Sequence, residues 1–148
     1  MTSFQQPLNA EGAEDAQKSQ KEVQKENDFS REIIGAAVEV QRVLGTGLLE
    51  SAYSAATAIE LSERELAIAR EVSIEGKYKG RELGLAYRAD LIVEQAVIVE
   101  VKAIEAINEL HRAQLLSYLR LSGLKLGLLI NFHAFPVVKG VHRLVNKL

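Results

Sequence analysis

The stretch that most constrains the fold of this 148-residue chain is residues 86–103, which read AYRADLIVEQAVIVEVKA. Two runs of apolar and β-branched residues flank a short polar break at Glu94-Gln95, a pattern that predicts two adjacent strands joined by a tight turn. Both runs are apolar on both of their faces, which is typical of central strands. The sequence therefore predicts a buried strand pair in the middle of a sheet.

Three charged residues, Asp90, Glu100 and Lys102, interrupt this apolar stretch. Burying an unpaired charge is unfavourable, so such residues usually lie at a metal, in an ion pair or where a substrate binds. Alternation along the strand places Glu100 and Lys102 on one face and Val101 on the other. The residues alone leave two interpretations open: a buried Lys–Glu pair with an aspartate at a strand end, or an active site.

The length of the turn decides whether the two acids meet. A two-residue loop at Glu94-Gln95 would set Asp90 opposite Val99 and leave Glu100 on the wrong face. An odd loop or a bulge would pair Asp90 with Glu100, with their Cβ atoms roughly 4.5–5.5 Å apart. That separation suits two carboxylates that hold one hard divalent cation, with Lys102 beside them to stabilise charge or activate water.

Composition narrows the class of protein. The length and the apolar content of 47% fit one globular domain. The chain has no 18-residue apolar run, no secretory h-region and no cysteine, and we expect a cytoplasmic protein without disulfides. Residues 1–75 carry 7 basic and 14 acidic residues, whereas residues 76–148 carry 11 and 6. The half with the candidate site is thus the basic half, which is compatible with a phosphate-bearing partner.

The pattern of elements predicts an α/β domain. Residues 1–27 are polar and predict a disordered or loosely helical tail, and residues 28–148 predict one folded domain. In that domain we expect helices at about 28–44, 48–66 and 108–121, strands at 70–79, 124–131 and 137–145, and the strand pair within 86–103. The order α-α-β-β-β-α-β-β implies a mixed sheet with helices packed on it, and strand 124–131 should be parallel to the strand before it because a helix connects them.

Two of these helices carry polar residues of interest. Glu50 and Tyr53 lie one turn apart near the start of the second helix, although a helix N-terminus alone also favours an acid. His111, Gln114 and Tyr118 form a polar stripe on the third helix. In the second helix the residues expected to be buried are Leu49, Ala52, Ala56 and Ile59.

The charged residues resemble a known signature. Asp90 followed by Glu100-Val101-Lys102 resembles the motif of the PD-(D/E)XK, restriction-endonuclease-like nuclease superfamily. GLLESAY at 47–53 resembles the motif that names the GxxExxY protein family. Other segments similar to that family are YRADLIV at 87–93, IVEVKA at 98–103, HRAQLLSYLR at 111–120 and LGLLINF at 126–132. The resemblance covers about residues 28 to 146. One departure is Val40-Gln41-Arg42, where the family tends to carry VHR.

The resemblance implies a restriction-endonuclease-like fold and a Mg²⁺-dependent nuclease, with Mn²⁺ as a substitute, for which DNA rather than RNA is the expected substrate. It implies that Asp90, Glu100 and the Val101 carbonyl hold the metal, with Glu50 as an extra acid. Lys102 would activate or stabilise the attacking water, and Gln114 would orient a phosphate or the lysine. The candidates for substrate binding are Tyr53, Arg88, His111 and Tyr118.

Two other functions remain open. The modest basic balance, without a dedicated DNA-reading motif, also fits a catalytically silent nucleic-acid-binding or protein-interaction module on the same fold. A third possibility is a homodimer or a subunit of a larger assembly, because about 120 folded residues leave little surface for gripping a duplex. A dimer would supply two sites for two strands.

Overall fold

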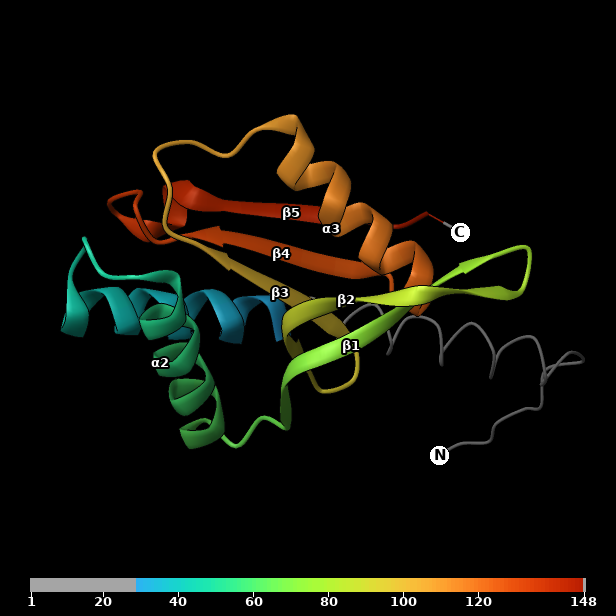
Figure 1. The fold of residues 1–148 in the computed structure, drawn as a ribbon. Helices are drawn as coiled ribbons and strands as arrows, with labels where there is room; N and C mark the ends of the chain where they lie inside the picture. Colours follow the sequence, from blue (N-terminus) through green and yellow to red (C-terminus); the bar gives the residue numbers. More distant parts are fainter. Residues whose placement is uncertain (1–28, 148) are drawn as a thin grey trace, which may run out of the picture.

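The computed structural model describes residues 29–147, and the tail predicted for residues 1–27 lies outside this range. The first helix covers residues 29–44 and is followed by α2 (Glu50–Glu63). The remaining elements are β1 (Ile68–Tyr78), β2 (Arg81–Val93), β3 (Val97–Lys102), α3 (Glu109–Ser122), β4 (Leu126–Asn131), the short 3₁₀ helix η1 (Val137–Gly140) and β5 (Val141–Val145). Their order confirms the predicted α/β arrangement (Figure 1). Over residues 29–147, no helix is long and apolar enough to cross a membrane.

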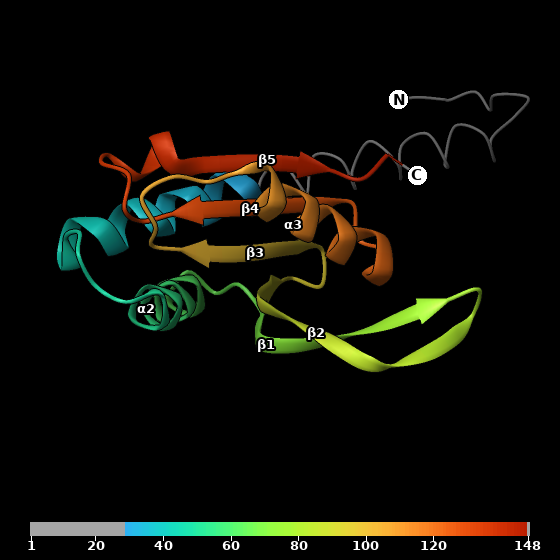
Figure 2. The ribbon, with the colours of Figure 1, turned by 45° about the horizontal axis from the view of Figure 1, so that its top comes forward.

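The five strands form one mixed sheet in the order β1-β2-β3-β4-β5. β3 and β4 are parallel, as predicted from the helix that connects them, and every other neighbouring pair is antiparallel. The first helix and α2 cover one face of the sheet, and α3 covers the other (Figures 1 and 2). This arrangement places β3 at the centre, and all of its residues except Lys102 are buried.

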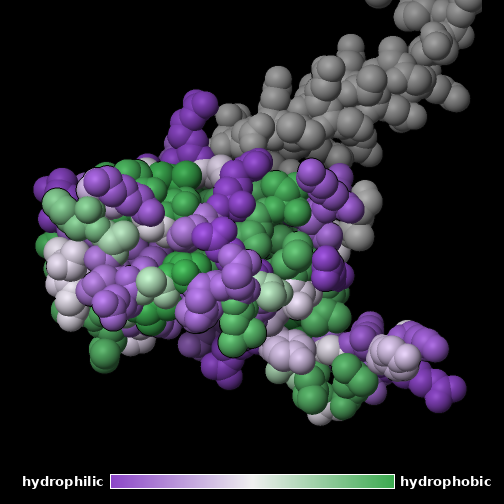
Figure 3. Space-filling view, turned by 90° about the horizontal axis from the view of Figure 1, so that it is seen from above, coloured by the Kyte–Doolittle hydropathy of each residue, from purple (hydrophilic) through white to green (hydrophobic). Residues whose placement is uncertain are grey.

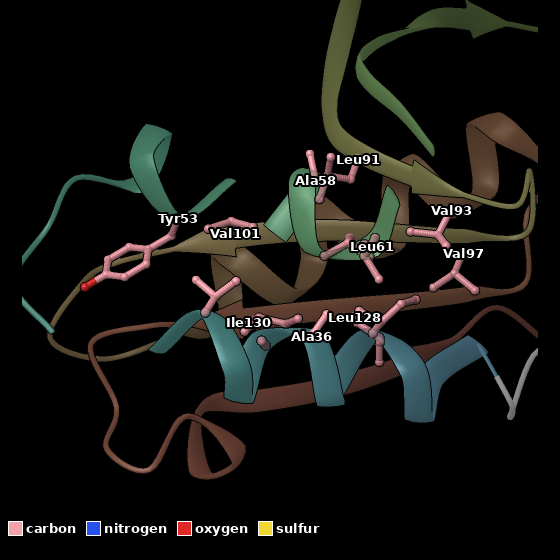
Figure 4. Close-up of a cluster of buried hydrophobic side chains, with 14 of the residues drawn as sticks. Ala36, Tyr53, Ala58, Leu61, Leu91, Val93, Val97, Val101, Leu128 and Ile130 are labelled. Carbon is pink, nitrogen blue, oxygen red and sulfur yellow. The ribbon is translucent and has the colours of Figure 1, made fainter. Parts of the chain in front are cut away.

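The alternation of β3 divides the core into two clusters. Val97, Val99 and Val101 pack with the first helix and α2 in the larger cluster (Figure 4). Ile98 lies in the smaller cluster, which α3 covers. Because alternate side chains of a strand share a face, Glu100 and Lys102 belong to the α3 side of the sheet. The face of β3 that carries the predicted site residues Glu100 and Lys102 is therefore the one beneath α3.

The prediction of which face of α2 is buried is wrong. Leu49 and Ile59 are 77% and 62% exposed, and the buried residues of the helix are Tyr53, Thr57, Ala58 and Leu61. The Tyr53 ring stacks on Phe132, with the ring centroids 4.6 Å apart. Burying the Tyr53 ring together with Leu61 removes a large apolar surface from water, and the aromatic stack adds to this stabilisation. These contacts set the rotation of the helix.

β2 is longer than the sequence pattern predicted, because it begins at Arg81 rather than at residue 86. β1 and β2 pair from Ile68–Val93 to Tyr78–Arg81, whereas β2 pairs with β3 only over residues 91–93. Residues 72–88 therefore form a two-stranded extension, here called the β-arm, which reaches past the rest of the sheet on the side of α3 (Figures 1 and 2). The β-arm becomes one wall of a groove described below.

The turn between β2 and β3 has three residues, Glu94 to Ala96, because Val93 pairs with Val97. The odd loop length, which the sequence left as one of two alternatives, is thus confirmed. Glu94 and Gln95 both have left-handed backbone conformations, with φ of 52° and 54°. Such a turn favours Asn-Gly, because residues with a Cβ are strained at positive φ.

Replacing Gln95 with glycine should therefore stabilise the fold. The left-handed conformation costs an L-residue roughly 1–2 kcal/mol, part of which is offset by the greater freedom of glycine in the unfolded chain, so we expect a gain of about 0.5–1 kcal/mol. Urea unfolding at fixed pH measures the change. Gln95→Ala is the matched control, since it shortens the side chain and keeps the Cβ. A Gln95→Gly variant no more stable than Gln95→Ala would contradict this account of the turn.

Candidate functional site

The two acids of the signature lie where β2 and β3 separate. The last pair of the ladder is Leu91–Val99, and Asp90 and Glu100 occupy the next positions. Each carboxylate binds the backbone of the opposite strand: Asp90 Oδ2 accepts a hydrogen bond from the Val101 N–H at 2.8 Å, and Glu100 Oε1 accepts one from the Asp90 N–H at 3.1 Å. Side chains thus replace the backbone ladder at this point. One oxygen of each carboxylate stays outside this pair of hydrogen bonds.

The environment of Glu100 disfavours its charge. The residue is 8% exposed, and burial together with the neighbouring charge of Asp90 raises the pKa of Glu100 to about 8, while the charge of Lys102 acts in the opposite direction. Both causes disfavour a second negative charge beside Asp90, so the protonated form of Glu100 is favoured at neutral pH in the absence of a cation.

Lys102 opens onto a groove between α3 and the β-arm. The groove has a volume of about 770 Å³, and its lining includes Lys102 together with His111, Gln114 and Tyr118. The structure thereby brings four of the predicted site residues to one concave surface. No ion pair or side-chain hydrogen bond within residues 29–147 engages the Lys102 ammonium. It is therefore available to an anion in the groove.

Tyr118 connects the groove to the acids. Burial, followed by the charges of Glu100 and Asp90, raises the pKa of the Tyr118 hydroxyl. The hydroxyl is therefore protonated at neutral pH and can donate a hydrogen bond. Its ring lies 5.6 Å from that of Tyr87 on the β-arm, measured between centroids. Tyr87 is a groove residue that the sequence analysis did not select.

The end of β3 is held in place by contacts that sequence reasoning missed. The Lys102 carbonyl accepts a hydrogen bond from the Phe132 N–H at 2.8 Å. The Asn131 amide binds both the N–H and the C=O of Ile104, at 3.1 and 2.8 Å. A polar residue at the end of the apolar run LKLGLLIN was the available signal for Asn131. These contacts fix the backbone on which Lys102 stands.

Gln41 supports the same region from the first helix. It is buried, its Nε2 donates to the carbonyls of Phe132 and Ala134 at 3.1 and 2.7 Å, and its Oε1 accepts from the Val137 N–H at 2.8 Å. The departure from VHR at this position therefore falls on a residue that supports the loop after β4. A histidine has one donor and one acceptor when neutral, so it could not form all three bonds.

Gln41→Leu should lower the free energy of unfolding by about 2–4 kcal/mol, because it leaves two carbonyls and an N–H without their hydrogen-bond partner, at buried or partly buried positions. Arg42→Leu is the neighbouring control. Its only ion pair in the described chain is with Glu39 on the surface, so its removal should change stability by no more than about 0.5 kcal/mol. Denaturant unfolding compares the two variants. Equal small effects would show that the loop does not depend on Gln41.

Two further predicted residues lie near the end of β3 or in the groove. Glu50 Oε2 accepts a hydrogen bond from the Ala103 N–H at 3.4 Å, which places this acid of α2 beside the residue that follows Lys102. His111 forms a capping box with Asn108: its Nδ1 accepts from the Asn108 N–H, and its own N–H donates to Asn108 Oδ1. Because Nδ1 is an acceptor here, Nε2 is the ring nitrogen that carries the proton.

The other two predicted residues lie elsewhere. The Tyr53 ring is fully buried, and its hydroxyl donates to the Gly45 carbonyl at 2.7 Å and accepts from the Leu48 N–H at 3.2 Å. This residue closes the turn before α2. Arg88 is exposed, and its guanidinium forms an ion pair with the Glu71 carboxylate, with 3.9 Å between Nη1 and Oε2. The ion pair therefore involves neither acid of the signature. Neither Tyr53 nor Arg88 is among the residues that line the groove.

The oxygen ligands suit a hard cation. Within residues 29–147, no group of three or more His, Cys, Asp or Glu side chains is arranged to hold a metal ion. Asp90 and Glu100 supply carboxylate oxygens, which fits Mg²⁺, an ion that keeps several waters and often uses only one or two carboxylates. The like charges at this point also favour a cation, because without one the pair retains a proton. The residues present therefore fit a magnesium site.

Comparisons with known proteins bear on the same stretch of chain. A family model described as the PD-(D/E)XK nuclease superfamily matches residues 27–144. No curated protein matches the chain, and no solved structure does. The family match spans the first helix, the whole sheet through most of β5, and both acids with Lys102. On this match the chain belongs to the PD-(D/E)XK nuclease superfamily.

Proposed function

We propose that residues 28–148 form a Mg²⁺-dependent nuclease domain that hydrolyses the phosphodiester bonds of nucleic acid, with DNA rather than RNA as the expected substrate. The observation that carries the proposal is the pair of interlocked acids, Asp90 of β2 and Glu100 of β3, close to Lys102, which lines the groove. The resemblance of residues 47–53 and of the segments around the acids supports placing the chain in the GxxExxY family.

In this proposal, Asp90 and Glu100 would hold the cation, helped by the Val101 carbonyl and by Glu50. The bound cation supplies positive charge that polarises the phosphate and acidifies water. Glu100 would have to be deprotonated to act as a ligand, so cation binding and ionisation of Glu100 would be coupled. Since both acids are fixed by backbone N–H groups, little reorganisation is needed on binding.

The remaining residues act on the phosphodiester. The Lys102 ammonium faces the negative charge that develops when water adds to phosphorus and the bond to the leaving oxygen breaks. The Gln114 amide and the proton on His111 Nε2 are donors on the same groove wall, suited to non-bridging phosphate oxygens. The Tyr118 hydroxyl, which also lines the groove, would contribute a neutral hydrogen-bond donor. A homodimer or larger assembly would add a second site for the second strand of a duplex.

The test is cleavage of labelled single-stranded DNA, duplex DNA and RNA in Mg²⁺ or Mn²⁺, with wild type, Asp90→Ala and Glu105→Ala compared. Glu105 is an exposed acid in the loop after β3 and serves as the matched control. We expect metal-dependent cleavage that Asp90→Ala abolishes and Glu105→Ala leaves unchanged. Cleavage that survives in Asp90→Ala, or none with any substrate and metal, would contradict the proposal.

A further inference from the structure

The groove that leads to Lys102 has a composition that points to its occupant. Three cationic residues line it: Lys77 from the β-arm, Lys102 from β3 and Arg120 from α3. No acidic residue is present among the lining side chains, all of which belong to the described chain. The chain as a whole has a net charge of −2, so this is a local concentration of positive charge. A polyanion is the complementary ligand.

The groove is also markedly apolar. Tyr87 and Leu83 of the β-arm are 40% and 53% exposed, and Leu110 of α3, across the groove, is 75% exposed. Figure 3 views the molecule from the side of α3 and shows hydrophobic and hydrophilic side chains interspersed, with the β-arm standing out from the body. Exposed aromatic and aliphatic surface next to cations is the combination that binds unpaired bases and their phosphates.

We propose that this groove binds one single strand of nucleic acid, with bases packed against Tyr87 and Leu83 and phosphates near Lys77, Arg120 and Lys102. The inference rests on the proposed function, since it takes the strand toward the acids that would cleave it. A base in a duplex is stacked and paired, so its faces are closed to protein side chains. The apolar wall would be of no use to a duplex, and the single strand is therefore the favoured substrate.

Binding is measured without catalysis. Fluorescence anisotropy with a fluorescein-labelled oligothymidylate of about 16 nucleotides, the upper end of common single-strand site sizes, is recorded in EDTA so that no metal-dependent cleavage occurs. The test variant is Lys77→Glu/Arg120→Glu. The matched control is Lys125→Glu/Lys139→Glu, which makes the same charge change at two exposed lysines that do not line the groove.

The groove variant should bind at least about tenfold more weakly at 0.1 M salt, with the slope of log affinity against log salt reduced by about 1.4, since each lost phosphate contact removes roughly 0.7. The control should stay close to wild type. Tyr87→Ala should also weaken binding about tenfold, and Tyr87→Phe should restore it. Thermal unfolding of each variant separates these effects from loss of fold.

Equal affinities of the groove and control variants would overturn the proposal, and so would wild-type protein that binds a duplex of equal length as tightly as the single strand. Photocross-linking with 5-bromodeoxyuridine gives an independent readout: cross-links should map to Tyr87 or Tyr118, and cross-links confined to other surfaces would also overturn it. If Asp90→Ala still cleaves nucleic acid while the binding results are as expected, only the nuclease proposal fails. If cleavage is lost in Asp90→Ala but the groove variant binds like wild type, only the proposal that the groove binds a single strand fails.

Discussion

Lys102→Met is expected to slow phosphodiester hydrolysis by about 10²- to 10³-fold while the protein still binds Mn²⁺. This is the typical loss when one preorganised group facing the developing charge is removed. Methionine keeps the length and apolar stem of the side chain, and within the described residues the ammonium has no ion pair to lose, so the fold should be unaffected. Single-turnover cleavage assays measure the rate.

The comparison must separate catalysis from metal binding. The charge of Lys102 lowers the pKa of Glu100, so its removal should raise that pKa further and weaken metal binding near neutrality. Assays above pH 8, with Mn²⁺ affinity measured by calorimetry, remove this contribution. Lys125→Met, an exposed lysine in the turn after α3, should cleave like wild type. A Lys102→Met enzyme with unchanged rate would exclude the lysine from the reaction.

Glu100→Gln is expected to make the metal-free protein more stable above neutral pH. The native pKa of about 8 lies above the ordinary value of 4.5, so between these values the native state holds a proton that the unfolded chain has lost. Stability from this group is complete below about pH 4.5 and falls as pH rises to about 8, with a slope near 1.4 kcal/mol per pH unit. Glutamine keeps an oxygen to accept the Asp90 N–H and cannot ionise.

Urea unfolding across this pH range, in the presence of a chelator, tests the effect. The wild-type free energy should decline relative to Glu100→Gln, and Glu105→Gln at an exposed position should track the wild type. Adding Mn²⁺ to the wild type should reverse the decline, because a cation replaces the proton between the acids. Parallel pH curves for wild type and Glu100→Gln would mean that Glu100 is not held protonated in the native state.

Much of the sheet could be predicted from the sequence because its signals are local. β3 is apolar at nearly every position and is buried at the centre, and the helix between β3 and β4 required a parallel pair. The sequence left two possible registers for the strand pair, and only one of them places Asp90 opposite Glu100. The choice between them depends on Ala96 as the third residue of the turn, and alanine carries no turn signal of its own.

The features that the sequence did not predict depend on tertiary contacts. The face of α2 is set by Tyr53 stacking on Phe132, which lies 79 positions further along the chain. The β-arm escaped notice because residues 81–85 contain glycine and two charges, and their strand is supported mainly by pairing with β1. Gln41 stood out in the sequence only as a departure from VHR, and its supporting role was hidden because its three partners are backbone atoms of a distant loop. The groove could not be predicted either, because the β-arm forms one of its walls.

The central claim is that Asp90 and Glu100 together hold a divalent cation beside Lys102. The most direct measurement is an anomalous difference map from crystals of the protein soaked in Mn²⁺. We predict one peak within coordination distance of an oxygen from each of the two acids, on the face of β3 that opens to the groove, and no such peak in crystals of Asp90→Ala. A map with no peak at the two acids, or with Mn²⁺ bound only elsewhere, would contradict the account.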